Sequence, residues 1–199
     1  SSFINIGPIA IINTKDGNKE TIKDPNRGSI YSGPLVILIN GFSASASEFF
    51  TNAMQDYKRA IIIGNQSHGK ATMQNILPLN NEINDPSEFI KITTDEFYRI
   101  TGKSNQTIGI TPDVIIPSLF DVQIPRESKN KTAIKNDIIE GVHRFTEYSN
   151  PNRNEVIEKS KIRVDANDDL KKITEMNVKI NKIYDEDLPP IKLNFDSVY

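Results

Sequence analysis

The chain has 199 residues, enough for one domain with its own hydrophobic core. Lys and Arg number 24 and Asp and Glu number 26, so the formal net charge is −2 and the basic surplus typical of a nucleic-acid-binding protein is missing. No apolar run approaches the roughly 18 residues of a membrane-spanning helix. The sequence has no Cys and only two His, which excludes disulfides, a Cys nucleophile and a metal site made of several His side chains.

The first half of the chain predicts alternating strands and a helix. Residues 8–12 predict a short strand, and the polar, turn-rich residues 18–33 predict a loop. Residues 35–39 are all apolar, which predicts a central strand covered on both faces. Residues 60–63 predict a second buried strand. Between these two strands, apolar residues recur at helical spacing and predict a helix that completes a βαβ unit: Ala46, Phe49, Phe50, Ala53, Met54 and Tyr57.

Further along, the pattern changes from strands to charged helices. Residues 73–77 predict a strand, and residues 89–92 and 97–100 predict two strands of a hairpin or meander. After about residue 120 the sequence is charged and rich in Asn and Lys. Residues 154–164 and 168–183 predict amphipathic helices there, the second ended by Leu188-Pro189-Pro190. The expected fold is therefore an α/β core over residues 1–120 and a mostly helical C-terminal extension over residues 121–199.

The segment between the first predicted βαβ strand and its helix carries a candidate nucleophile. Residues 42–48 read Phe-Ser-Ala-Ser-Ala-Ser-Glu, which places Ser45 at the helix N-terminus. Unpaired backbone N–H groups and the helix dipole favour negative charge there, as the oxyanion of a tetrahedral intermediate requires. The same residues also fit an ordinary Ser-rich N-cap with small neighbours for close packing.

A second candidate group follows the second βαβ strand. Because both strands end at the same edge of the sheet, Lys70 is expected near Ser45. A desolvated, neutral lysine can act as a general base. Gln74 lies four residues further on, and its carbonyl oxygen could accept a hydrogen bond from the Lys70 amine and orient it. A solvated side chain is the ordinary alternative for a single lysine.

Together these segments resemble the tail-specific, or C-terminal processing, serine peptidases. The resemblance covers roughly residues 6–117, with several motifs in the family's order and spacing. The matching residues are Phe42 to Glu48, Gln55-Asp56-Tyr57, Arg59-Ala60, Gly69-Lys70, Thr72, Gln74, Phe97-Tyr98-Arg99, Gly102, Ser104, Gln106, Gly109-Ile110, Thr111-Pro112-Asp113 and Pro117.

The resemblance implies a fold and a chemistry. It implies the second half of a peptidase core of stacked ββα units, like that of the crotonase and Clp protease superfamily. It also implies Ser45 as nucleophile, Lys70 as base, Gln74 as the amide that orients Lys70, and the Ala46 backbone N–H as an oxyanion donor. The implied reaction is endoproteolysis at or near unstructured protein C-termini, in the periplasm or cell envelope, with no cofactor or metal.

Two positions depart from the family pattern. His68 stands where the family usually has Phe, and Ala71 replaces a usual Gly. His68 raises an alternative base, in a Ser-His-Asp triad with Asp56 or Asp113. We expect instead that His68 packs as the family's ring does, and that the other histidine, His143, lies on the surface.

Parts of the family pattern are missing from the sequence. Family members carry a PDZ domain and the first half of the core upstream, and neither is recognisable here. The chain opens on Ser1-Ser2-Phe3, with no initiator Met and no signal-peptide pattern. We therefore expect the C-terminal part of a longer peptidase, with its upstream parts and an adaptor protein as possible partners. Two other classes of protein are alternatives: a catalytically incompetent scaffold fragment, and a crotonase-type acyl transferase, which is disfavoured because no CoA site is recognisable.

Overall fold

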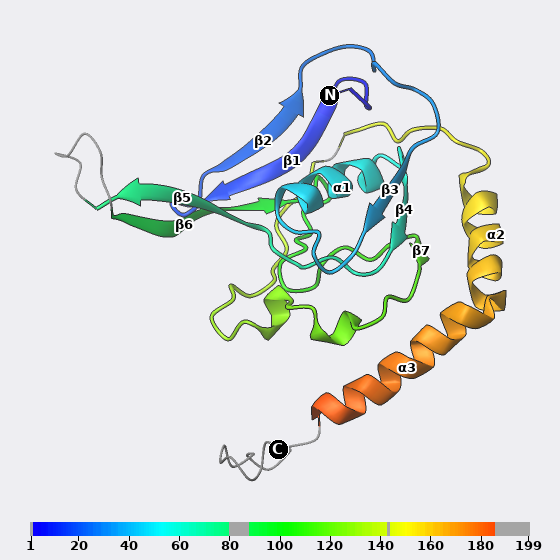
Figure 1. Cartoon of the computed structure of the whole chain (residues 1–199). Helices are drawn as coiled ribbons and strands as arrows, with labels where there is room; N and C mark the ends of the chain where they lie inside the picture. Colours follow the sequence, from blue (N-terminus) through cyan, green and yellow to red (C-terminus); the bar gives the residue numbers. More distant parts are fainter. Residues whose placement is uncertain (1, 80–87, 143, 186–199) are drawn as a thin grey trace, which may run out of the picture.

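The computed structural model describes residues 2–79, 88–142 and 144–185 (Figure 1). Its larger sheet is antiparallel, with strand order β2-β1-β6-β5. The strands are β1 (Gly7–Thr14), β2 (Lys19–Asp24), β5 (Thr72–Pro78) and β6 (Phe89–Tyr98). The far ends of β5 and β6 extend away from the rest of the molecule as a two-stranded arm (Figure 1).

The smaller sheet is parallel and carries the predicted βαβ unit. Its order is β3-β4-β7, with β3 (Val36–Ile39), β4 (Ile61–Gly64) and β7 (Val114–Ile115). Helix α1 (Ala46–Asp56) connects β3 to β4 and contacts both β4 and β1, so it joins the two sheets. The predicted helix and the two βαβ strands are therefore confirmed.

The core lies around the C-terminal half of α1. Its buried members come from α1, from the smaller sheet and from irregular segments around both sheets: Ile4, Ile39, Ala53, Met54, Tyr57, Ala60, Ile62, Ile100 and Ile110. The start of the predicted apolar helix face is less covered, since Ala46 is exposed and Phe50 is 38 % exposed. The opposite, polar face of α1 is buried instead and carries Glu48, Asn52 and Asp56. This buried polar face places the groups described below.

Three predictions about strands were wrong. Residues 19–24 form β2 and not a loop, because their backbone pairs with β1 although their side chains are mostly polar. The two strands predicted at 89–92 and 97–100 are one continuous strand, β6. β3 is an edge strand and not a central one, and its Leu38 side chain is 75 % exposed. An apolar run indicates that a strand favours burial, but it does not say which neighbours cover it.

The C-terminal region begins with irregular structure and ends in two helices. Two short 3₁₀ turns, η1 (Asp121–Gln123) and η2 (Glu127–Lys129), follow β7. Helices α2 (Arg153–Ala166) and α3 (Asp168–Asp185) form at the two predicted positions and lie along one side of the core (Figure 1). The amphipathic pattern predicted for both helices is confirmed for α3 and wrong for α2, whose apolar residues do not gather on one face. The predicted end at Leu188 lies outside the described residues. Within the described ranges, no helix has the length and apolarity needed to cross a membrane.

Candidate active site

Ser45 lies at a strained backbone position between β3 and α1. It is the N-cap of α1 with φ of 52° and ψ of −110°. A non-glycine residue at positive φ costs conformational energy, and such strain is concentrated at functional sites. Ala46 is the first residue of α1, so its N–H is one of the first-turn groups that no helix carbonyl accepts. This strand–turn–helix geometry presents a serine beside free backbone donors, as the nucleophile elbow of α/β-hydrolases does.

Glu48 connects this turn to the loop that carries Lys70 (residues 65–71, called the Lys70 loop below). Its side chain is completely buried. Glu48 Oε2 accepts hydrogen bonds from the backbone N–H of Ser45 at 3.0 Å and from the backbone N–H of Lys70 at 2.8 Å. Both predicted catalytic residues therefore have their backbone nitrogens within hydrogen-bond distance of one oxygen atom.

The other oxygen of Glu48 binds the start of the same loop. Oε1 accepts hydrogen bonds from the Gly69 N–H at 2.8 Å and from the Ser67 hydroxyl. The Ser67 oxygen in turn accepts the Ile110 N–H at 2.6 Å. A further bond joins the loop to the serine turn directly, because the His68 N–H donates to the Ser43 carbonyl at 2.9 Å. The four hydrogen bonds compensate the cost of burying the Glu48 carboxylate, because hydrogen bonds to a charged group are stronger than those between neutral groups.

The Lys70 amine and the Gln74 amide have different partners in this structure. Lys70 Nζ donates to Thr72 Oγ1 at 2.6 Å, and the Lys70 residue is half-buried. Gln74 is exposed, and its Nε2 donates to Thr93 Oγ1 on β6 at 3.4 Å. The register of β5 against β6 shifts between Met73 and Gln74, just past Thr72. In the structure, the lysine amine therefore contacts Thr72, and the Gln74 amide nitrogen contacts Thr93.

The residues of the alternative triad have partners of their own. His68 Nδ1 lies 2.9 Å from the Pro125 carbonyl, and its Nε2 lies 3.5 Å from Glu127 Oε2. Asp56 forms an ion pair with Arg99, and Asp113 accepts hydrogen bonds from Arg153 and from the backbone N–H of a β4 residue. Both ring nitrogens of His68 thus face the segment after β7. His143 lies outside the described residues.

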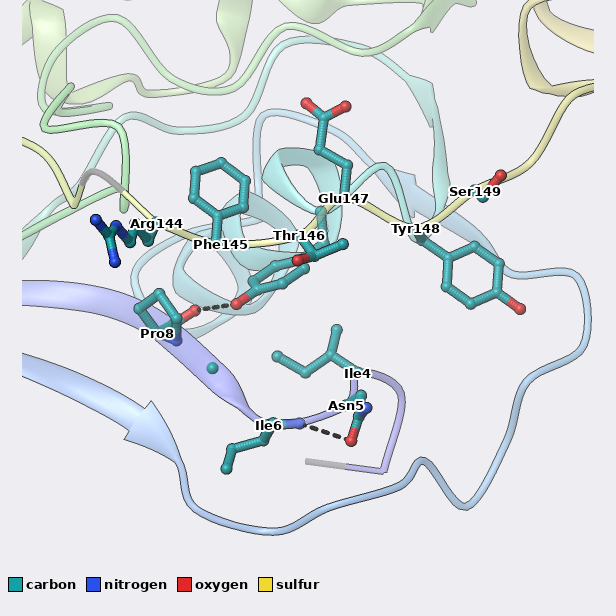
Figure 2. Close-up of a pocket in the computed structure, with 12 residues that line it drawn as sticks. Ile4, Asn5, Ile6, Pro8, Arg144, Phe145, Thr146, Glu147, Tyr148 and Ser149 are labelled. Carbon is teal, nitrogen blue, oxygen red and sulfur yellow. Dashed lines mark hydrogen bonds between the residues drawn. The ribbon is translucent and has the colours of Figure 1, made fainter.

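A cavity of about 710 Å³ lies away from these groups, between the chain before β1 and residues 144–149 (Figure 2). Tyr57, the residue that follows α1, is part of its lining, and the Tyr57 hydroxyl donates to the Pro8 carbonyl at 2.9 Å. The lining includes none of Ser45, Lys70 and Gln74. The cavity therefore contributes no residue to the candidate site. Among the residues described, no cluster of His, Cys, Asp and Glu could bind a metal ion.

Sequence reasoning missed part of this site. The Ser45-x-x-Glu48 spacing is that of a capping box, which indicates the contact between Glu48 and the Ser45 N–H. No pattern indicates that the same carboxylate also binds Ser67, Gly69 and Lys70. Those contacts depend on the position of the loop after β4.

Comparison with known proteins gives the family. The model of the family described as "Peptidase family S41" matches residues 1–116. A tail-specific protease of Haemophilus influenzae is 36 % identical over 69 % of this chain and 20 % of its own length. A carboxy-terminal-processing protease of Bartonella bacilliformis is 40 % identical over 58 % of this chain and 26 % of its own length.

Among solved structures, the chain is similar to a photosystem II D1 C-terminal processing protease. The two share 28 % identity and a TM-score of 0.49 over 57 % of this chain and 28 % of the other. This chain thus spans about a quarter, or less, of the two curated relatives described above. The family match covers more than half of the chain and includes both the Ser45 turn and the Lys70 loop. The chain belongs to peptidase family S41.

Proposed function

We propose that this chain carries the catalytic centre of a serine endopeptidase, with Ser45 as nucleophile and Lys70 as general base. The observation that carries the proposal is the pair of hydrogen bonds to Glu48 Oε2, which brings the backbones of Ser45 and Lys70 together. The strained φ of Ser45 and its place at the start of α1 also support it. Membership of a peptidase family agrees with this chemistry.

The proposed reaction proceeds through an acyl-enzyme. Neutral Lys70 accepts the Ser45 hydroxyl proton while Ser45 Oγ attacks the scissile carbonyl carbon. The Ala46 N–H donates to the oxyanion, and Lys70 returns its proton to the leaving amine. Water then attacks the acyl-enzyme carbonyl carbon and gives a proton to Lys70. The bond between that carbon and Ser45 Oγ breaks, Lys70 returns the proton to Ser45 Oγ, and the carboxylic acid product leaves.

The orientation of Lys70 involves two candidate side chains. Thr72 Oγ1 accepts a hydrogen bond from Lys70 Nζ and keeps the amine on the side of the strand where Thr72 lies. Gln74 remains the predicted orienting amide, a role that would require its side chain to leave Thr93.

The substrate class and the cellular context belong to the same proposal. We infer cleavage at or near unstructured C-termini, because the relatives are named tail-specific and carboxy-terminal-processing proteases. We also propose a periplasmic or envelope location, a crotonase- or Clp-like core ending near residue 120, and an extension over residues 121–199. An upstream PDZ domain and an adaptor protein are the proposed partners.

Substitution of the two catalytic residues tests the proposal. In the intact protein, Ser45→Ala and Lys70→Ala should each abolish peptide cleavage and labelling by a fluorophosphonate, while the thermal unfolding temperature stays near that of the wild type. Their effects should not add, since the two residues act as one unit. Ser47→Ala is the matched control, because Ser47 is an exposed serine in the same turn and should retain activity. Cleavage by the Ser45→Ala protein would refute the proposal.

A second pair of variants separates Lys70 from His68 as the base. Lys70→Arg keeps a cation, but a guanidinium stays protonated at any working pH and cannot accept the serine proton. We expect Lys70→Arg to be inactive and His68→Phe to retain cleavage. If His68 were the base, His68→Phe would be inactive, and the wild-type rate would rise with pH near the ordinary histidine pKa of about 6.5.

A further inference from the structure

The Lys70 loop is bound on a second side by the segment that follows β7. The carbonyl groups of the loop accept hydrogen bonds from this segment, and the Gly69 and Lys70 N–H groups on its other side donate to Glu48. Arg126 Nη1 donates to the carbonyls of Gln66 and Ser67, the latter at 2.8 Å. The backbone N–H of Glu127 donates to the His68 carbonyl at 3.1 Å. Three consecutive carbonyls of the loop are therefore bound by residues 126 and 127.

Arg126 is itself oriented and shielded from solvent. Its Nη2 forms an ion pair with Asp121 Oδ1 at 2.7 Å, and only 12 % of its side chain is exposed. A guanidinium is planar and donates in a fixed geometry, so one ion pair with Asp121 aims Nη1 at the loop carbonyls. The loop is thus bound between a buried carboxylate, Glu48, and a nearly buried guanidinium.

The same segment also packs against the turn that carries Ser45. A Cβ atom added at Gly41 would lie 2.7 Å from Ile124 Cγ2 and 3.1 Å from Arg126 Cζ. Ile124 is buried, and Gly41 is the second residue after β3. Residues 121–129 therefore contact both chain segments of the candidate site, although they follow the residues that match the peptidase family (Figure 1).

We propose that Arg126 is a positioning residue for catalysis, through which residues 121–129 determine where the Lys70 loop lies relative to Ser45. The inference rests on the proposed function of Ser45 and Lys70. The guanidinium of Arg126 hydrogen-bonds to the loop backbone and to Asp121 and lies beside Gly41, so it acts by holding these segments and not on the substrate. Displacement of a catalytic group by about 1 Å lowers a rate by up to about 100-fold.

The test compares two matched arginines in the intact protein. Arg153 has the same exposed fraction as Arg126, 12 %, and the same 2.7 Å ion pair with an aspartate, but it binds α2 to Asp113 and the Ala60 carbonyl. Arg126→Ala should lower kcat and the rate of fluorophosphonate labelling by about 10-fold or more with KM unchanged. Arg153→Ala should lower neither rate. Guanidinium ion, added below a denaturing concentration, should restore part of the kcat lost in Arg126→Ala. It should not raise the kcat of Arg153→Ala.

Each outcome bears on the proposal. An unchanged kcat in Arg126→Ala, or an equal loss in Arg153→Ala, overturns it. If Arg126→Ala fails to fold, Asp121→Asn and Arg126→Lys take its place, and wild-type kcat in both overturns it. Ser45→Ala and Lys70→Ala proteins are measured in parallel, and activity in either would refute the proposed function itself. If both are inactive while Arg126→Ala is fully active, only the role of Arg126 is refuted.

Discussion

At the scale of single residues, the site depends on the two side-chain oxygen atoms of Glu48. A carboxylate only accepts hydrogen bonds, and each Glu48 oxygen receives two donors. No neutral side chain of the same shape has two acceptor oxygens. The residue therefore stabilises the fold and positions Ser45 and Lys70 through the same contacts.

Glu48→Gln should destabilise the protein and slow catalysis. In this variant an amide NH₂ replaces one of the two acceptor oxygens and faces two hydrogen-bond donors. These buried groups are then unpaired, at a cost of about 1–3 kcal/mol. Urea unfolding measures that loss, and fluorophosphonate labelling measures the effect on Ser45. Glu155→Gln, which changes an exposed glutamate of α2 paired with Lys159, should change neither quantity. Wild-type stability and labelling in Glu48→Gln would show that the carboxylate has no such role.

At the scale of elements, the parallel pair β3 and β4 brings the two site segments to one edge. Ile39, the last residue of β3, pairs with Gly64, the last residue of β4. The Ile39 carbonyl then accepts the Asn65 N–H at 2.9 Å. Gly64 has φ of 126°, and a Cβ there would lie 2.0 Å from the Ile39 carbonyl oxygen. Glycine is required because the two backbones approach this closely where the Lys70 loop begins.

Gly64→Ala should therefore destabilise the protein by more than about 1 kcal/mol, because the residue would combine an unfavourable φ with a backbone clash. Gly17→Ala is a matched control, since Gly17 also has positive φ, 79°, but has open space around its Cβ position. Thermal or urea unfolding of both variants measures the difference. Equal losses would mean that φ alone, and not the close approach to Ile39, requires glycine at residue 64.

At the scale of the whole molecule, buried ion pairs connect elements that lie far apart in the sequence. Asp56, at the end of α1, pairs with Arg99, directly after β6, and Arg99 Nε donates to it at 2.9 Å. Burial raises the pKa of Asp56 above its ordinary value, although Arg99 opposes this shift. The burial of the Asp56 carboxyl therefore makes the free energy of unfolding depend on pH.

The sign of that dependence follows from the direction of the shift. In the window above the ordinary aspartate pKa of about 4, the folded protein retains the Asp56 proton where the unfolded chain has lost it. The contribution of Asp56 to stability is therefore present below this window and is lost as pH rises through it. The free energy of unfolding, measured with urea across these pH values, should fall less steeply with rising pH in Asp56→Asn than in the wild type. Asp16→Asn, at an exposed turn, should leave the slope unchanged, and an equal slope in Asp56→Asn would contradict the assignment.

The sequence alone determined the βαβ unit and the local setting of the two catalytic candidates. The helical repeat of apolar residues predicted α1, and the two short apolar runs predicted β3 and β4. These patterns are visible in the sequence because they involve only residues that are close together along the chain. The Ser-rich turn before α1 placed Ser45 at a helix N-terminus, and Lys70 followed the second strand. Charged helical patterns predicted α2 and α3 in the same way.

Only the tertiary structure decided which distant groups meet. β2 is polar and forms because β1 provides a pairing edge, and β3 lies at a sheet edge that its apolar sequence does not indicate. Thr72 contacts Lys70 Nζ, a contact that no sequence pattern indicated. Arg126 reaches the Lys70 loop from about 60 residues away in the sequence. Such contacts depend on the paths that the long loops take around the core. The spacing of apolar residues in a single sequence carries no information on those paths.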